Sequence, residues 1–271
     1  MTQALSPKIQ KYLAILALSM REKSLHTANI VGSALVILLR IWIFYALYTA
    51  AFVSQNIASM QHQTVQMIVW TLMFSQSFQM AAKPQMMTEI EETIRSGQIA
   101  NTISKPYSYL LFNFFLFTGR LLPRLFLNVL TGLVACLILL GPITITLSGL
   151  ASGLLTLILG IILHFCISMM ICLSAFWIET TRPLYWIYSK AQLVLGGLIV
   201  PLTLLPGMVK TVSELLPFSQ MFYTPATLLI YFRSDTFSHV LLIQLAWIVV
   251  TILLLLLLFS KGVRHVAQNG G

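Results

Sequence analysis

The chain contains 271 residues, of which 58% are apolar and only 8% are charged. A soluble domain has about 25% charged residues, so this chain has too few polar side chains to cover a surface that faces water. The net charge is +9. This composition predicts an integral membrane protein and excludes a soluble domain, a disordered chain and a nucleic-acid-binding domain.

The N-terminal segment, residues 1–24, is expected to form an amphipathic helix that lies in the inner membrane interface. Lys8 and Lys11 lie opposite a set of apolar residues that recur at helical spacing. This set contains Leu5, Ile9, Tyr12, Leu13, Leu16 and Met20. A cleaved signal peptide is the alternative, but charged residues 21–23 directly follow its apolar core.

Six stretches of the chain meet or approach the length of about 20 apolar residues that a transmembrane helix needs. They cover residues 30–53, 65–82, 121–140, 150–178, 184–205 and 240–259. The sequence therefore predicts an all-α membrane protein with six transmembrane helices.

The segment before the third span, residues 107–118, is also apolar, but Gly119, Arg120 and Pro123 interrupt it before the span begins. It either lies in the inner interface or begins a long, kinked third helix. We favour the interfacial start.

A seventh apolar stretch, residues 215–231, is short and contains Pro217 and Pro225. Proline lacks a backbone N–H, and unpaired backbone groups are costly in lipid, so a full crossing is not expected. We predict instead an outer re-entrant region, residues 207–237, between the fifth and sixth spans.

Basic residues fix the expected orientation. With the N-terminus inside, the inner segments hold eleven Lys and Arg residues, whereas the outer loops hold only Lys210 and Arg233. Because cytoplasmic loops carry the excess of Lys and Arg, both termini are expected in the cytoplasm, and the protein in a bacterial-type inner membrane.

The seven acidic residues all lie outside the centres of the expected spans. Ion-driven carriers usually hold an ionisable group at mid-membrane, so the driving force is expected to come from another polypeptide. The chain has no phosphate-binding GxxxxGK motif and no HExxH or GxSxG motif. Three scattered cysteines without CxxC spacing give no zinc site. No catalytic residue, metal or cofactor is therefore expected on this chain.

The largest cytoplasmic loop, residues 86–104, holds a cluster of three acids: Glu89, Glu91 and Glu92. Thr88 and Glu91 have the spacing of a capping box, which predicts a helix start, and Gly97 predicts its stop. Ile90 and Ile94 share one face of this helix of about two turns. It is either a knob that fits a groove on a partner or a solvated connector.

The run from Glu89 to Ile99, followed by Lys105 and Pro106, resembles the cytoplasmic loop after the second span of ABC type-2 exporter permeases. Residues 196–206, 216–218 and 223–226 resemble the fifth span and outer re-entrant region of the same family. The similarity covers nearly the whole chain, which is expected to form a single ABC type-2 transmembrane domain over residues 1–271.

This resemblance implies a permease that works as a homo- or heterodimer in membrane lipid, for efflux. A separate cytoplasmic ATPase would bind ATP and Mg and drive the dimer through the loop at 86–104. The expected coupling residues are Glu89, Ile90, Glu91, Glu92, Ile94, Arg95 and Gly97. The alternatives are an ion-coupled secondary transporter, an intramembrane enzyme or a membrane assembly scaffold.

Among the polar residues within the expected spans, Arg40 and His164 each allow two interpretations. Arg40 is near mid-membrane, where the insertion of an Arg side chain costs about 2.5–3.5 kcal/mol. It either bonds to neighbouring groups in a structural role or lines the translocation pathway. His164, inside the fourth span, is either packed in the protein or a pathway group.

Overall fold

The computed structural model describes residues 7–21, 27–54, 63–82 and 85–268, and these form helices joined by turns and loops, with no β-strand among them. The helices in chain order are α1 (Pro7–Met20), α2 (Thr27–Ser54), α3 (Val65–Ala81), α4 (Gln85–Arg95), α5 (Ile99–Ile103), α6 (Tyr109–Leu140), α7 (Leu147–Leu173), α8 (Arg182–Leu195), α9 (Gly207–Leu215), α10 (Pro217–Met221), α11 (Tyr223–Ile230) and α12 (Ser234–Gln268). Two 3₁₀ turns, η1 (Ser174–Phe176) and η2 (Leu202–Leu204), flank α8.

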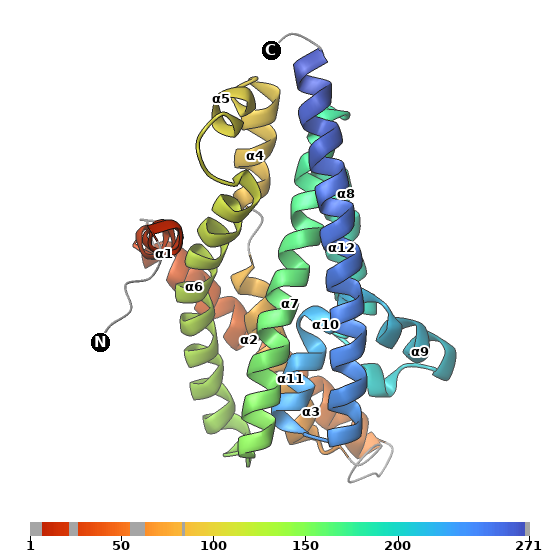
Figure 1. Cartoon of the computed structure of the whole chain (residues 1–271). Coiled ribbons are helices and arrows are strands. Elements are labelled where there is room, and N and C mark those ends of the chain that lie inside the picture. Colours follow the sequence, from red (N-terminus) through yellow and green to blue (C-terminus); the bar gives the residue numbers. More distant parts are fainter. Residues whose placement is uncertain (1–6, 22–26, 55–62, 83–84, 269–271) are drawn as a thin grey trace, which may run out of the picture.

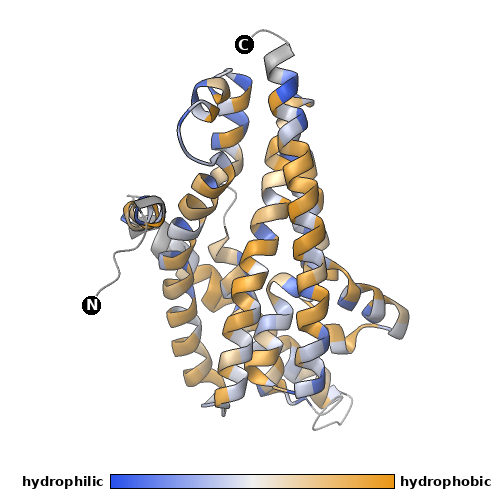
Figure 2. Ribbon diagram, in the orientation of Figure 1, coloured by the Kyte–Doolittle hydropathy of each residue, from blue (hydrophilic) through white to orange (hydrophobic). Residues whose placement is uncertain are grey.

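The long helices α6, α7 and α12 run side by side along one axis of the molecule (Figure 1). One end of the bundle carries α4, α5 and the C-terminal part of α12, and we call it the α4 end. The opposite end carries α11 and the first residues of α12, and we call it the α11 end. Figure 2 shows that apolar residues dominate the helices between the two ends.

Four of the described helices are long and apolar enough to cross a membrane. Their spans are Gly32–Ser54, Tyr109–Leu140, Leu147–Phe176 and Ser234–His265, which overlap the expected first, third, fourth and sixth spans. The prediction of an all-α, multi-pass membrane protein is therefore confirmed, while the count of six crossings stays a prediction.

The expected second span is present as α3, which is shorter than the four long helices. Its 17 residues rise about 25 Å, somewhat less than the hydrocarbon core of about 30 Å. Twelve of the 17 are buried, because α3 packs against α2, α6 and α11. α3 is thus an interior helix of the bundle.

The expected fifth span is not one continuous helix, so that prediction is wrong for residues 196–205. α8 ends at Leu195, and Gly197 follows with φ +70, where a Cβ atom would lie 2.9 Å from the ring of Tyr223. Pro201 and Pro206 then supply no N–H for a helical ladder. The glycine turn and the two prolines end the helix within a largely apolar run.

The favoured interfacial start for residues 107–118 is also wrong. α6 is one helix from Tyr109 to Leu140, and Ser108 caps it by accepting a hydrogen bond from the N–H of Leu111. Pro123 lies inside the helix without ending it. The 32 residues rise about 48 Å, which exceeds the hydrocarbon core, so α6 extends beyond it.

Residues 207–237 contain the short helices α9, α10 and α11. α11 packs against α7 and α3, and α10 packs against α7 and α12, while α9 projects to one side (Figure 1). Glycines on α7 allow this close approach. A Cβ atom at Gly160 would lie 2.3 Å from the carbonyl oxygen of Met221, and one at Gly153 would lie 2.9 Å from Cβ of Leu229.

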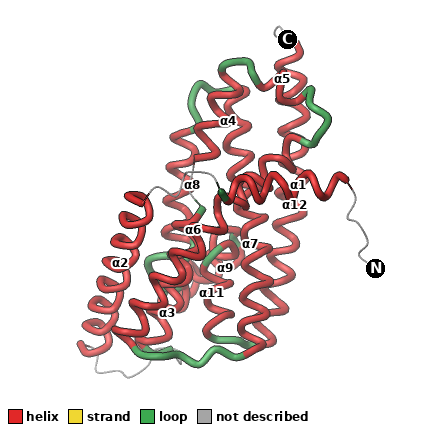
Figure 3. Tube along the Cα trace, turned by 90° about the vertical axis from the view of Figure 1, so that its left-hand side faces the viewer, coloured by secondary structure: helices red, strands yellow, loops and turns green. Residues whose placement is uncertain are grey.

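The expected N-terminal helix is present as α1, while residues 1–6 and 22–24 of that segment lie outside the described residues. α1 lies across the direction of the long helices, and Figure 3 shows it from the side. It packs against α6. The ring of Tyr12 stacks on Phe115 at 5.3 Å, and its hydroxyl accepts a hydrogen bond from the N–H of Ser108. Its place in a membrane interface stays a prediction.

Candidate functional site

The acidic cluster lies on α4, and two details of this helix differ from the prediction. α4 begins at Gln85, so Thr88 is not its cap, and its 11 residues make about three turns instead of two. Met86 and Met87 are buried, and their packing extends the helix toward the N-terminus. Gly97, with φ +73, ends it as predicted.

One face of α4 belongs to the core of the protein. Ile90 and Ile94 are buried, and α4 packs against α7 and η1. Glu89, Glu92 and Arg95 are exposed. The predicted shared face of the two isoleucines is therefore occupied by the protein itself, and only the charged side of the helix is open to a partner.

Glu91 is turned inward, unlike the other two acids. It is only 8% exposed, and its carboxylate accepts hydrogen bonds from the backbone N–H of Thr181, at 3.2 Å, and from the hydroxyl of Thr181. The guanidinium of Arg95 lies 3.8 Å from the same carboxylate. Thr181 directly precedes α8, so this contact joins α4 to the start of α8.

The surroundings of Glu91 keep it ionised. Burial acts to raise the pKa of Glu91, but hydrogen bonds from Thr181 and Thr180 and the charge of Arg95 outweigh it, and the pKa is lowered. At neutral pH the group is a carboxylate held by donors on another segment of the chain.

Glu89 forms an ion pair with Arg120 on α6, with 2.6 Å between the guanidinium nitrogen and the carboxylate oxygen. The side chain of Arg120 is 13% exposed, and that of Glu89 is 51% exposed. An ion pair with one exposed partner contributes about 0.2–1 kcal/mol to the stability of a protein. It links α4 to the early part of α6.

The charged side of α4 borders a hollow of about 410 Å³ at the α4 end. Its lining contains Thr88, Glu91, Glu92, Arg95, Ser96 and Arg182. Three of the predicted coupling residues therefore meet at one surface, next to the first residue of α8. Of the other four, two are core residues, Glu89 pairs with α6, and Gly97 ends the helix.

Arg40 lies on α2, away from this cluster. Its guanidinium donates a hydrogen bond to the side-chain oxygen of Gln76 on α3, and the amide of Gln76 donates to the carbonyl oxygen of Leu198. Arg40 therefore helps to hold α2, α3 and the chain after α8 together. This agrees with a structural role, and a role in the pathway stays a prediction.

His164 is also bonded within the protein. Its Nδ1 lies 2.8 Å from the hydroxyl of Tyr188, and its Nε2 lies 3.4 Å from the hydroxyl of Ser168. The imidazole thus joins α7 to α8 in the buried interior, which agrees with a packed histidine.

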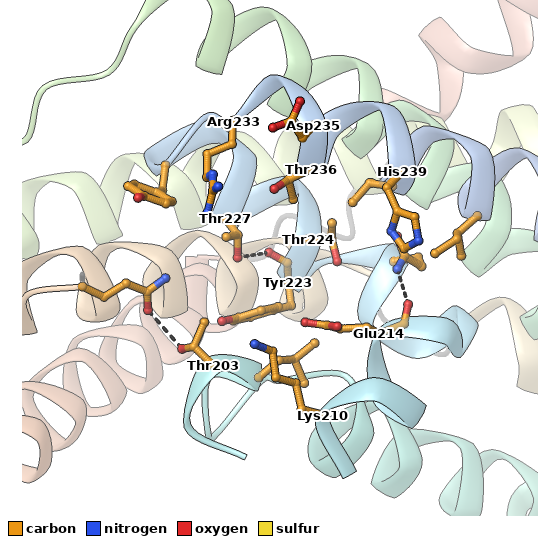
Figure 4. Close-up of a pocket in the computed structure, with 16 residues that line it drawn as sticks. Thr203, Lys210, Glu214, Tyr223, Thr224, Thr227, Arg233, Asp235, Thr236 and His239 are labelled. Atoms are coloured by element: carbon orange, nitrogen blue, oxygen red, sulfur yellow. Dashed lines mark hydrogen bonds between the residues drawn. The ribbon is translucent and has the colours of Figure 1, made fainter. Parts of the chain in front are cut away.

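A second pocket, of about 490 Å³, lies near the α11 end between η2, α9, α11 and the start of α12 (Figure 4). Five ionisable residues line it: Lys210, Glu214, Arg233, Asp235 and His239. Hydroxyl groups of threonine and tyrosine line the wall between them. Within the part of the chain that the structure describes, no hydrogen bond or ion pair joins these five side chains to another residue.

This pocket was not predicted from the sequence. A signal exists, because five ionisable residues fall within residues 210–239 of a chain that is 8% charged. Lys210 and Glu214 lie on α9, whereas Arg233, Asp235 and His239 lie just before α12 or in its first turns. The packing of α10 against both helices brings the two groups together. Spacing along the chain does not contain that information.

Comparison with known protein families identifies the family of this chain. A family model described as ABC-2 family transporter protein matches residues 35–270. The chain belongs to this family. No curated protein matches it in a sequence search. The family match confirms the resemblance seen in residues 89–106 and 196–226.

The ABC-2 match begins in α2 and ends beyond α12, so it includes α4, the break after α8 and the pocket at the α11 end. The chain is a multi-pass membrane protein of a transporter family. Within the described residues no group of three or more His, Cys, Asp or Glu residues is placed to hold a metal ion.

Proposed function

We propose that this chain is the permease subunit of an ATP-driven exporter and that it has no active site of its own. The observation that carries the proposal is α4, a helix with a buried apolar face and an exposed charged face, in a chain whose ABC-2 family membership implies an ABC ATPase partner. ATP and Mg would bind to that ATPase, which is a separate polypeptide.

α4 would be the coupling helix. Closure of the ATPase on ATP would push on the exposed residues Glu92 and Arg95, while the buried contacts of α4 pass the movement into the bundle. Such switching is a rigid-body movement driven by a ligand that binds one state better. The cargo would then leave at the opposite end of the bundle.

The distribution of basic residues supports this orientation. Lys105, Arg182 and Lys261 belong to the α4 end, whereas Lys210 and Arg233 belong to the α11 end. The positive-inside rule then places the α4 end and both termini in the cytoplasm of a bacterial-type cell.

We infer that the number of crossings is six. α3 would cross as an interior helix, and α8 would cross together with residues 196–206 as a broken helix. Irregular backbone is tolerated at membrane depth where protein buries it, and Leu198 and Leu202 of this segment are buried. Residues 207–237 would then form the re-entrant region, and a second permease would complete a homo- or heterodimer.

The docking role of α4 is tested by reversing its exposed charges. We expect the double variant Glu92→Lys and Arg95→Glu to lose co-purification with the ATPase, because both side chains line the hollow beside α4. Glu179→Lys, on an exposed loop residue, is the matched control and should retain it. Unchanged co-purification and unchanged ATP-dependent export in the double variant would refute the assignment.

A further inference from the structure

We propose that Glu91 is a positioning residue that passes the movement of α4 directly to α8 through its buried contact with Thr181. The inference rests on the proposed function, because it requires an ATPase that moves α4. It assigns a route through the protein that does not follow the chain.

The burial of Glu91 is exceptional in this protein. Among the described residues it is the one Asp, Glu, Lys or Arg side chain that is buried. An ionised carboxylate is costly to bury unless hydrogen bonds and charges compensate it. Thr181, itself 1% exposed, supplies two donors, so the two residues hold each other at one fixed position.

The start of α8 is shaped for this contact. The hydroxyl of Thr181 makes no capping bond to its own helix and donates to Glu91 instead. The carboxylate also lies at the N-terminal end of α8, where the helix dipole favours a negative charge. These interactions all act across 90 residues of sequence, between α4 and α8.

The covalent neighbours of α4 lead to α3 on one side and, through α5, to α6 on the other. Neither connection leads to α8. Through Thr181, a displacement of α4 reaches α8 at its first turn, and side chains farther along α8 continue the route. The hydroxyl of Tyr188 and the amide of Gln192 each lie 3.3 Å from the sulfur of Met221 on α10.

The consequence is that α4 and α8 move as one body, and that α8 carries the movement toward the break at Gly196 and the short helices beyond it. Without the contact, α4 would still move when the ATPase closes and would keep its packing on α7 and η1. It would lose its direct bond to the first turn of α8, so α8 would not follow. This difference between α4 and α8 distinguishes transmission from a loss of folding.

The experiment follows the two helices separately in the complex of the full chain with its ATPase. Gln98→Cys, in the turn after α4, and Lys190→Cys, on the exposed side of α8, serve as reporters in separate samples. The native cysteines are buried, and labelling of the parent chain measures their background. The rate of thiol labelling is measured with and without a non-hydrolysed Mg-nucleotide.

In the chain with Glu91 intact, we expect the nucleotide to change the labelling rate at both reporters. In Glu91→Ala the change at position 98 should remain, while the change at position 190 is lost. Glu179→Ala, which removes a nearby exposed carboxylate, should retain both changes. A change at position 190 that persists in Glu91→Ala would overturn the inference.

A second pair of variants applies if Glu91→Ala does not assemble. Thr181→Ser keeps both donors and should retain the change at position 190, whereas Thr181→Val removes the hydroxyl and should reduce it. Where Glu91→Ala does assemble, its double variant with Thr181→Val should be no worse than Glu91→Ala alone, because the two residues act through one contact. Equal behaviour of the Ser and Val variants would overturn the inference.

Failure of the proposed function gives a different result. In that case the chain with Glu91 intact would not bind an ATPase, or the nucleotide would change neither reporter. Failure of this inference alone leaves both changes present in every variant.

Discussion

The two ends of the bundle differ in whether their charged side chains are bonded to other residues. At the α4 end, Glu91 is buried against Thr181 and Glu89 is paired with Arg120. At the α11 end, five ionisable side chains line one pocket and none is paired within the described residues. Paired charges fix the relative positions of helices, which suits a surface that transmits movement. Unpaired charges leave a polar pocket open, which suits a surface where a cargo or water is exchanged.

The largest effect should come from breaking a fixed charge at the α4 end. We expect Glu91→Ala to lower the free energy of unfolding by about 1.5–3 kcal/mol, the range for hydrogen bonds to a charged group. Thermal or denaturant unfolding of the purified chain measures it. Glu179→Ala is the control and should change the value little; equal losses in both variants would mean that the buried contact adds no stability.

A second test concerns the packing that builds the pocket at the α11 end. A Cβ atom at Gly160 would clash with the backbone of Met221. We therefore expect Gly160→Ala to lower the free energy of unfolding by about 1–3 kcal/mol. Nothing lies within 4 Å of a Cβ atom at Gly207, and Gly207→Ala should stay within about 0.5 kcal/mol of the parent chain. If the two variants unfold alike, α10 does not rest on α7 as described.

The contribution of Glu91 to the free energy of unfolding should also depend on pH. Because the folded protein lowers the pKa of Glu91, its contribution to stability is present above the ordinary value of 4.5 and is lost as the pH falls through the folded pKa. We expect the difference in unfolding free energy between the parent chain and Glu91→Gln to be constant above pH 4.5 and to shrink below it. A difference that stays constant in acid would contradict the buried carboxylate.

The smallest effect on stability is expected in the pocket itself. Lys210 has no partner to lose among the described residues, so Lys210→Ala should change the free energy of unfolding by less than about 0.5 kcal/mol. The same unfolding measurement checks this. A loss as large as that of Glu91→Ala would show that the charges at the two ends do not differ.

The parts of the fold that depend on apolar length were predictable from the sequence. α2, α6, α7 and α12 each contain one of the long apolar stretches, although α6 begins earlier than predicted. Prolines indicated that residues 215–231 do not form a simple crossing. The end of α8 at Leu195 was not predicted, because residues 198–205 remain largely apolar after the glycine pair. Hydropathy measures which residues prefer lipid, whereas the break depends on backbone conformation and on the approach of Tyr223.

The candidate site was predictable only in part. The sequence correctly predicted a helix near Glu89 with Ile90 and Ile94 on one side, and Gly97 correctly indicated its end. The predicted cap at Thr88 was wrong, because the helix begins at Gln85. The inward position of Glu91 depends on Thr181, which lies 90 residues away in the sequence. The pocket at the α11 end likewise depends on a tertiary contact, between α9 and α12 across α10.

The central claim is that a separate ATPase acts on this chain at α4. Its most direct test is site-specific photo-cross-linking in native membranes, with the cross-linking residue placed at Glu92 on α4 or at Lys210 in the opposite pocket. The account predicts a covalent adduct with an ABC ATPase from position 92 and none from position 210. An ATPase adduct from position 210 but not from position 92 would contradict it. Transport by the purified chain in the absence of any ATPase would contradict it as well.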